Sequence, residues 1–156
     1  MPHIHEKIDF CSEVFVVYKN KVLLRKHDKY KIWLSVGGHI EPDEDPNVAA
    51  IREVKEEVGL DIILFKEKDR QPDFNDGHNT SLIPPQFVLR HPITEIHSHV
   101  VFVYFAKSTT DQVQLSKTEV TEDCRWFTKE EVLKNEIGLL ALIQFYALKA
   151  LEKLSE

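Results

Sequence analysis

The segment from Pro46 to Gly59 constrains this chain more than any other, because it predicts one amphipathic helix. Pro46 suits the first turn of a helix, and Gly59 suits the residue that ends it. At about 100° per residue, one side of this helix collects the apolar residues Val48, Ile51, Val54 and Val58. Nearly the opposite side collects three carboxylates, those of Glu53, Glu56 and Glu57. The sequence therefore predicts a helix that docks through one face and presents carboxylates on the other.

The carboxylate cluster needs a partner, because each like-charged pair at these spacings destabilises a helix by about 0.2–0.5 kcal/mol. Arg52 lies four residues before Glu56 and can pair with it. The simplest alternative is a solvated acidic surface. A divalent cation gives another explanation, since Mg²⁺ is bound by carboxylate oxygens together with substrate phosphates. Two such ions could activate a water molecule and stabilise the leaving oxygen in a displacement at phosphorus.

Two glycines before the helix extend the candidate site. The backbone at Gly37 and Gly38 can approach a ligand closely and offer a carbonyl oxygen to a metal ion. Glu44 lies between these glycines and the helix. The short run from Trp33 to Val36 predicts a strand that leads into the glycines.

The composition is that of one globular domain spanning residues 1–156. With 42% hydrophobic residues the chain can form one sizeable core, whereas a second full domain is hard to accommodate. Its 20 basic and 26 acidic side chains give a formal net charge of −6. This balance argues against a nucleic-acid partner, because binding to that backbone depends on clustered Lys and Arg. A nucleotide is still compatible, since a bound cation can approach its phosphates.

Cysteine usage and hydropathy favour the cytoplasm. Cys11 and Cys124 lie far apart without a second nearby thiol, as is typical of free thiols in a reducing cytosol. The first residues lack the apolar stretch of a signal peptide. The longest mainly apolar run, Ile137 to Leu148, is too short to span a bilayer. We therefore expect a cytoplasmic protein with no membrane partner.

Short strands are expected both before and after the acidic helix. The expected strands are 14–18, 22–24, 33–36, 61–65, 87–89, 100–105 and 125–127. Residues 69–85 are rich in Asp, Asn, Gly and Pro and are expected to form a loop. Thr128 and Glu131 have the spacing of a capping box, and a last helix is expected from about Gly138 to Leu154. Core packing is the simplest role of its apolar stripe, with a dimer contact as the alternative: Leu139, Leu142, Ile143, Tyr146 and Leu151.

Taken together, these residues resemble a known family signature. Gly38, five residues, Glu44, seven residues and then Arg52 to Leu60 match the Nudix box, G-x5-E-x7-R-E-U-x-E-E-x-G-U with U aliphatic, at every defined position. A chance match in a chain of this size is on the order of one in ten million. A weaker resemblance covers most of the chain. One departure is Val36, where many relatives have proline, and its side chain is not expected to bind metal.

The resemblance implies a fold and an activity. The expected fold is a Nudix-type α/β/α sandwich around a central mixed β-sheet. The expected activity is hydrolysis of a pyrophosphate bond in a nucleoside diphosphate linked to another moiety, with Mg²⁺ or Mn²⁺ as cofactor. The partner would be a small nucleotide-type substrate, and a homodimer is a further expectation because dimers are common in the family. One alternative is a Nudix-fold sensor that binds a nucleotide or sugar nucleotide without cleaving it.

The resemblance also implies roles for residues of the box. Glu53, Glu56 and Glu57 would be metal ligands and catalytic residues, with the Gly38 carbonyl completing the coordination. One of these glutamates, or a glutamate outside the box, would position or deprotonate the attacking water. Three residues would support them: Arg52 would orient a carboxylate, Glu44 would hold the loop or contact metal indirectly, and Gly59 would end the helix.

Some relatives take a further metal ligand from the loop before the Trp126 strand. The candidates here are Glu119 and Glu122, of which Glu122 is favoured, with surface acids as the simpler interpretation. An alternative substrate class is 5′-triphosphorylated RNA. The residues that would support it form only a modest basic cluster, more simply interpreted as a solvated loop: Lys26, Lys29 and Lys31.

Substrate specificity must come from residues outside the box. His97 and His99 alternate on one face of their predicted strand and could line a substrate pocket. They could also bind metal, but two histidines without a third ligand at evident spacing predict zinc only weakly. Trp33 and Phe87 could stack on a base, although core packing is the simpler role for each.

Overall fold

A computed structural model describes residues 4–117 and 121–156, and for residues 121 and 122 it describes the backbone only. The helices and strands follow in chain order: β1 (Ile8–Tyr18), β2 (Lys21–His27), β3 (Trp33–Leu34), β4 (Val36–His39), α1 (Pro46–Val58), β5 (Ile62–Leu64), β6 (Phe87–Pro92), β7 (Ser98–Ser108), β8 (Thr121–Thr128), α2 (Lys129–Lys134) and α3 (Ala141–Leu154). Each strand and helix expected from the sequence has a counterpart, but the single strand expected over 33–36 is divided into β3 and β4. Most of the other strands are longer than expected. In the described part of the chain, no helix is long and apolar enough to cross a membrane.

The strands form a mixed sheet with β1 at its centre. Its main order is β3-β2-β1-β7-β5, with β4 on β1, β6 on β7 and β8 on β2. β1 runs parallel to β7, and the other pairs are antiparallel. The two ends of β1 have different neighbours, because Val17 pairs with Val22 of β2 whereas Cys11 pairs with His39 of β4. This arrangement places the end of β4 against the start of β1.

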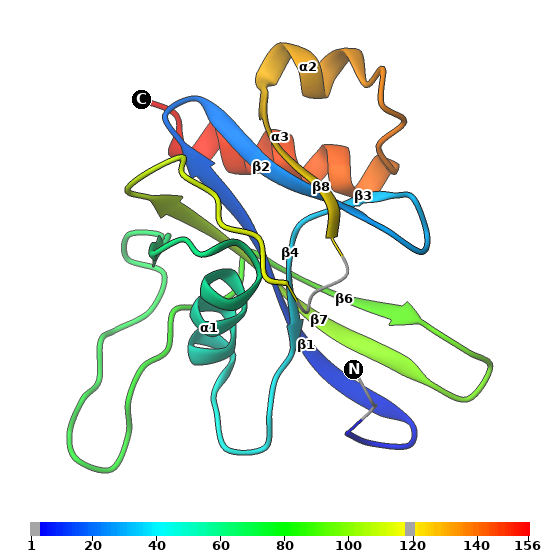
Figure 1. Cartoon of the computed structure of the whole chain (residues 1–156). Coiled ribbons are helices and arrows are strands. Elements are labelled where there is room, and N and C mark those ends of the chain that lie inside the picture. Colours follow the sequence, from blue (N-terminus) through cyan, green and yellow to red (C-terminus); the bar gives the residue numbers. More distant parts are fainter. Residues whose placement is uncertain (1–3, 118–120) are drawn as a thin grey trace.

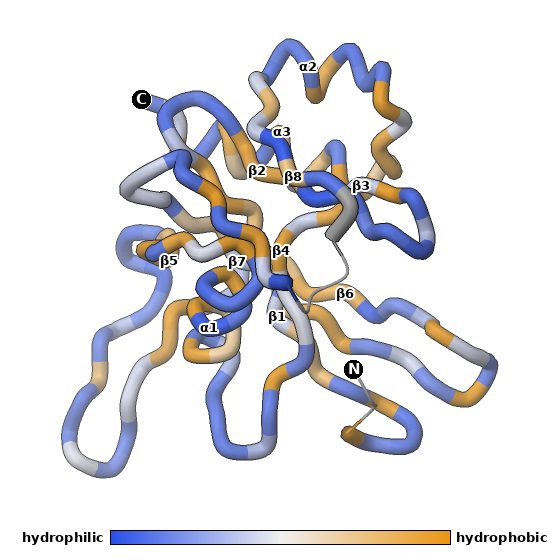
Figure 2. The backbone as a smooth tube through the Cα atoms, viewed as in Figure 1, coloured by the Kyte–Doolittle hydropathy of each residue, from blue (hydrophilic) through white to orange (hydrophobic). Residues whose placement is uncertain are grey.

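Helices cover both faces of the sheet. Alternate residues of a strand point to opposite faces, so Phe15 packs in the core that contains Leu151 of α3. Its neighbour Val16 packs in the core that contains Val54 of α1. Figure 1 shows α1 apart from α2 and α3, with strands between them, and Figure 2 shows apolar residues gathered on the central strands. The expected α/β/α sandwich with a central mixed sheet is confirmed.

The docking face of α1 differs from the predicted one. Val48 and Ile51 are 49% and 45% exposed, so their predicted place on the docking face is wrong. The sheet instead contacts the side of α1 that carries Ala49, Ala50, Val54 and Val58. Small side chains let a helix approach the sheet closely, whereas the pattern of larger apolar residues predicted a different face. The same rotation brings Glu53 and Glu57 to the edge of the buried face.

Local signals set most helix ends. The Asp45 side chain accepts hydrogen bonds from the N–H groups of Asn47 and Val48, and Gly59 ends α1 with φ of 71°. The predicted capping box of Thr128 and Glu131 is confirmed. The last helix begins at Ala141, so its predicted start at Gly138 is wrong. Gly138 has φ of 74° and belongs to the turn that separates α2 from α3.

Candidate functional site

Two carboxylates of α1 lie buried. Glu53 is 2% exposed and Glu57 is 3% exposed, whereas the Glu56 side chain is 54% exposed. Gly38 packs directly against the Glu53 carboxylate, because a Cβ built on Gly38 would lie 2.6 Å from Glu53 Oε1. Only a glycine leaves this space free. The structure thus brings Gly38 and Glu53 into contact and leaves Glu56 nearer to solvent.

Arg52 joins the helix, the preceding loop and β4. Its Nη1 donates to Glu53 Oε1 at 3.0 Å and to Glu56 Oε2 at 3.1 Å, which confirms the expected pairing with Glu56. Its Nε and Nη2 donate to the two oxygens of Glu44 at 2.9 and 2.6 Å, and Nη2 also donates to the His39 carbonyl at 3.0 Å. The hydrogen bond from Arg52 is the main cause that lowers the pKa of Glu44. The guanidinium therefore links the loop, β4 and two carboxylates of the helix.

Glu57 faces a different cation. Arg25 Nε of β2 lies 3.0 Å from Glu57 Oε2 and also donates to the Ser35 carbonyl at 3.0 Å. The Ser35 hydroxyl in turn donates to Glu13 Oε2 at 2.5 Å. Burial raises the pKa of Glu13, while Arg25 and the hydrogen bond from Ser35 oppose this effect. A continuous polar chain therefore runs from the helix carboxylate through β2 to β1.

A cavity of about 260 Å³ opens beside Glu13 on the α3 face of the sheet. It is mainly apolar, with a few polar groups, as is usual for small-molecule sites. Residues from β1, β6, β7 and α3 line it, among them Leu89, His99 and Tyr146. A larger hollow of about 680 Å³ lies by the turn after β1 and the end of α3, and none of the residues Gly38 to Leu60 lines it. The smaller cavity is the one connected to the buried glutamates.

Comparison with known proteins gives the family. The sequence model of the NUDIX domain matches residues 13–148. This chain belongs to the NUDIX family. A solved hydrolase of the NUDIX family from Clostridium perfringens is 34% identical, with a TM-score of 0.81 over 92% of this chain and 96% of that one. The MutT NUDIX hydrolase from Burkholderia pseudomallei is 19% identical, with a TM-score of 0.65 over 96% of this chain and 100% of that chain, and shares the fold.

A shorter match concerns a curated enzyme. The dihydroneopterin triphosphate diphosphatase of Haemophilus influenzae is 49% identical over 55 residues, which cover 33% of this chain. The match spans only 35% of that relative's length.

The structure places the predicted substrate-binding residues in different surroundings. His99 lines the cavity, and His97 lies buried beside it, with 5.4 Å between the ring centroids. Trp33 is buried between Phe127 and the guanidinium of Arg125. Phe87 packs on Tyr146 and two further aromatic rings, Phe105 and Phe145. Neither Trp33 nor Phe87 is among the residues that line the cavity.

The two candidate ligands outside the Nudix box stay predictions. Glu119 lies outside the described residues. The backbone of Glu122 belongs to β8, but its side chain lies outside what the structure describes. Cys11 and Cys124 are free cysteines, as expected.

Sequence reasoning did not single out several polar residues near the site. Glu13 interrupts the buried run of β1, and its charge within a strand-like sequence was the available signal. His39 directly follows Gly38, yet it occupies a position that the Nudix box leaves undefined. Asp9 is fully buried at the start of β1, outside the strand predicted from residue 14. These residues meet only because β1, β4 and β7 pair.

Proposed function

We propose that this chain is a metal-dependent pyrophosphohydrolase that acts on a small nucleotide-type substrate. The contact between Gly38 and the buried carboxylate of Glu53 is the observation that carries the proposal. It unites the first and the central residues of the Nudix box in one place, with Glu57 one helical turn further along. A solvated acidic surface would leave these carboxylates exposed. Family membership supports the same reaction class.

The residues present fit a magnesium or manganese ion. Carboxylate oxygens and a backbone carbonyl are donors that suit Mg²⁺, and the backbone of Gly38 packs against the Glu53 carboxylate. Glu53, Glu57 and the Gly38 carbonyl would hold the ion, with Glu56 at the exposed side. When bound, such an ion neutralises phosphate charge and increases the acidity of water.

The other residues of the box act on these ligands. Arg52 holds Glu53 and Glu56 in orientation while its second edge fixes Glu44 and the loop. One glutamate accepts a proton from the attacking water, the water oxygen bonds to one phosphorus, and the bridging oxygen leaves with the other phosphate. Two phosphorylated products and one proton result. We assign Glu57 a principal catalytic role, because it is buried and pairs with Arg25, the start of the polar chain that reaches the cavity.

We infer that the 260 Å³ cavity takes the group attached to the diphosphate. Tyr30, His99 and Tyr146 supply ring surfaces there, and Glu13 supplies an acceptor for a ring N–H. A heterocycle with donor groups fits this lining. The name of the Haemophilus influenzae relative suggests dihydroneopterin triphosphate as one member of the substrate panel.

A phosphohydrolase screen tests the proposal. The panel would contain nucleoside triphosphates, dihydroneopterin triphosphate, dinucleoside polyphosphates, nucleotide sugars, ADP-ribose and 5′-triphosphorylated RNA, each with Mg²⁺ or Mn²⁺. We expect metal-dependent cleavage of a pyrophosphate bond in at least one small substrate, with products identified by mass spectrometry. Compounds that raise the melting temperature without any cleavage would indicate the sensor instead and would overturn the proposal.

Glu57→Gln is the decisive variant. It preserves the shape of the side chain but removes the negative charge, so we expect kcat to fall by orders of magnitude with the fold intact. Steady-state kinetics and circular dichroism would measure the two effects. Glu67→Gln is the matched control, because Glu67 pairs with Lys153 of α3, away from the box. Equal turnover in the Glu57 variant and the wild type would refute the catalytic assignment.

A further inference from the structure

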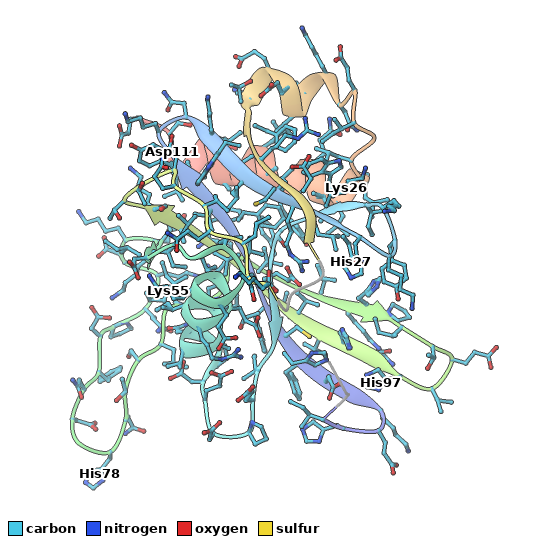
Figure 3. All side chains as sticks on the ribbon, viewed as in Figure 1. Lys26, His27, Lys55, His78, His97 and Asp111 are labelled. Carbon is cyan, nitrogen blue, oxygen red and sulfur yellow. The ribbon has the colours of Figure 1, made fainter. Side chains whose placement is uncertain are left out.

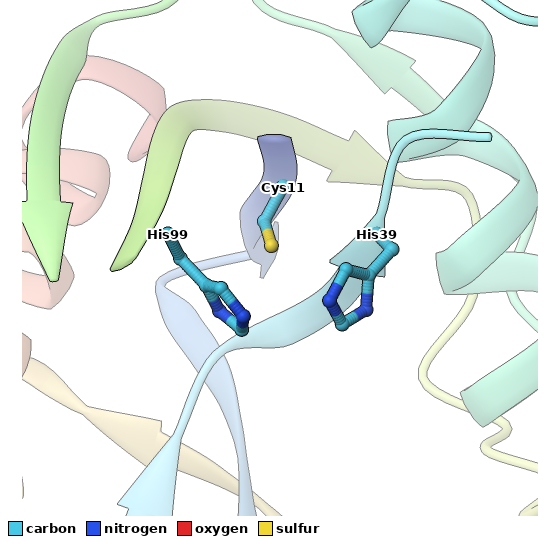
Figure 4. A group of neighbouring side chains, drawn as sticks. All are labelled: Cys11, His39 and His99. Atoms are coloured by element: carbon cyan, nitrogen blue, oxygen red, sulfur yellow. The ribbon is translucent and has the colours of Figure 1, made fainter. Parts of the chain in front are cut away.

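A second group of metal-binding side chains lies outside the Nudix box glutamates. Figure 4 shows the side chains of Cys11, His39 and His99 directed toward one another from three strands. The sheet register explains their convergence, because Cys11 pairs with His39 across β1 and β4 while Asp9 pairs with His99 across β1 and β7. His97 lies two residues before His99 and therefore points to the same face. Five potential ligands thus meet at one end of the sheet.

The donor atoms lie close enough to share an ion. Two groups of three residues each bring one donor atom per residue within 4.8 Å of the others. The first group is Cys11, His39 and His99, and the second is Asp9, His97 and His99. Asp9 Oδ2 is 3.3 Å from Nε2 of both His39 and His97. Zinc bonds of 2.0–2.1 Å to nitrogen or oxygen place the ligands of a tetrahedral site about 3.3–3.4 Å apart. The two 3.3 Å separations therefore have the length of tetrahedron edges.

Backbone groups orient two of these ligands. His97 Nδ1 lies 2.9 Å from the Glu6 carbonyl, so a proton on Nδ1 can be donated there and Nε2 then faces Asp9 with its lone pair. The backbone N–H of His5 donates to Asp9 Oδ1 at 2.8 Å, so the other oxygen, Oδ2, faces His39 and His97. Metal-binding histidines and carboxylates are commonly held in this way by outer hydrogen bonds.

The charge around the thiol also favours a cation. Burial and, after it, the nearby carboxylates of Glu13, Asp9 and Glu53 together raise the pKa of the Cys11 thiol to about 12. A divalent ion at this place would be attracted by the same carboxylates and would take the position of the thiol proton.

We propose that this cluster binds a divalent transition-metal ion of the zinc class, with His99 as the ligand common to both groups of three. Imidazole nitrogen and thiolate sulfur prefer zinc to magnesium, whereas the box offers oxygen donors that suit magnesium. The two sites are neighbours, because His39 follows Gly38 and its carbonyl accepts a hydrogen bond from Arg52. A zinc ion would link β1, β4 and β7 and would brace the strand end that presents Gly38.

Metal retention tests this proposal without any substrate. The full chain is stripped with a chelator, loaded with Zn²⁺ in a large excess of Mg²⁺, desalted and assayed for metal by mass spectrometry. We expect one zinc ion per chain to be retained. Loading with Co²⁺ should give the intense visible bands of a tetrahedral nitrogen- and sulfur-containing site. A wild-type chain that keeps no zinc would overturn the proposal whatever the variants do.

Variants assign the ion to its site. His99→Ala should abolish retention, whereas His78→Ala should retain zinc, because His78 lies at the tip of a distant loop (Figure 3). Circular dichroism in chelator checks that each variant folds, and Cys11→Ser gives a second, more conservative change that should weaken the cobalt bands. Glu57→Gln should keep the ion. Loss of zinc in Glu57→Gln with retention in His99→Ala would place the ion in the box and refute the proposal.

Discussion

At the scale of single residues, Gly38 and Glu53 depend on each other. Gly38 belongs to β4 and Glu53 to α1, and their contact leaves no room for a side chain on the glycine. Arg52 Nη1 donates to an oxygen of the same carboxylate, Glu53 Oε1, at 3.0 Å. The position of the carboxylate is therefore set by a backbone and by a guanidinium, which together limit its freedom to move.

Gly38→Ala should impair activity more than stability. The new Cβ would lie 2.6 Å from Glu53 Oε1, so the carboxylate must shift. Misplacement of a reacting group by about 1 Å can cost about 100-fold, and we expect a loss of that order in kcat/KM. Steady-state kinetics and urea unfolding would separate the two effects. Gly77→Ala is the control, because its Cβ meets nothing within 4 Å but is strained by a φ of 87°. It should lower the free energy of unfolding while its kinetics match the wild type.

At the scale of elements, short local signals hold the helix ends. In α2 the Thr128 hydroxyl accepts from the Glu131 N–H, and the Glu131 carboxylate accepts from the Thr128 N–H at 2.7 Å. The backbone hydrogen bond from Thr128 is the main cause that lowers the pKa of Glu131 below 4.5. This helix follows β8 directly, so its cap also fixes the direction in which the chain leaves the sheet.

The capping box predicts a pH-dependent difference in stability. A carboxyl group whose pKa is lower in the folded state contributes stability above its unfolded pKa, here about 4.5, and loses it as the pH falls through the folded pKa. The free energy of unfolding of Glu131→Ala should thus fall below that of the wild type at pH 7, and this gap should narrow below pH 4.5. Glu130→Ala is the matched control. A gap that stays constant down to pH 3 would contradict the prediction.

At the scale of the whole molecule, the box helix and the cavity lie on opposite faces of the sheet and are connected through Arg25. α1 packs on one face, and the cavity lies between the other face and α3. Arg25 connects the two regions, because it contacts Glu57 and the Ser35 carbonyl, and Ser35 bonds to Glu13 at the cavity wall. In the proposed enzyme, one region holds the diphosphate and the other holds the attached group.

Filling the cavity should weaken substrate binding. Leu89 of β6 lines it, so Leu89→Trp should occupy its space and raise KM for the substrate found in the screen, with a smaller effect on kcat. Val88→Trp is the matched control, because Val88 directly precedes Leu89 in the same strand, points to the opposite face and is exposed. Equal KM values for the Leu89 variant and the wild type would remove the cavity from the substrate site.

Much of the architecture could be predicted from the sequence. Strand runs such as 14–18 and helix signals such as Pro46, Gly59 and Thr128 act within a few residues, so they can be recognised without knowledge of the fold. The spacing of the Nudix box likewise identified the family before any contact was known. The start of α3 was wrong by three residues, because the apolar run continues through a turn that Gly138 and Asn135 form with positive φ.

The sequence alone thus determined which carboxylates share one helix, because helical spacing is a local property. It did not determine how that helix is rotated. The face with Ala49 and Ala50 docks rather than the face with Val48 and Ile51, since the fit to the sheet decides how close the helix can lie.

Tertiary structure also decided which side chains surround His97 and His99. The two histidines alone predicted a zinc site only weakly, because the sequence shows no third ligand near them. Asp9, Cys11 and His39 supply donors from strands about 60 to 90 residues away, through the register of β1 with β4 and β7. Pairing between distant strands depends on the packing of the whole sheet, so it cannot be predicted from the residues around each histidine.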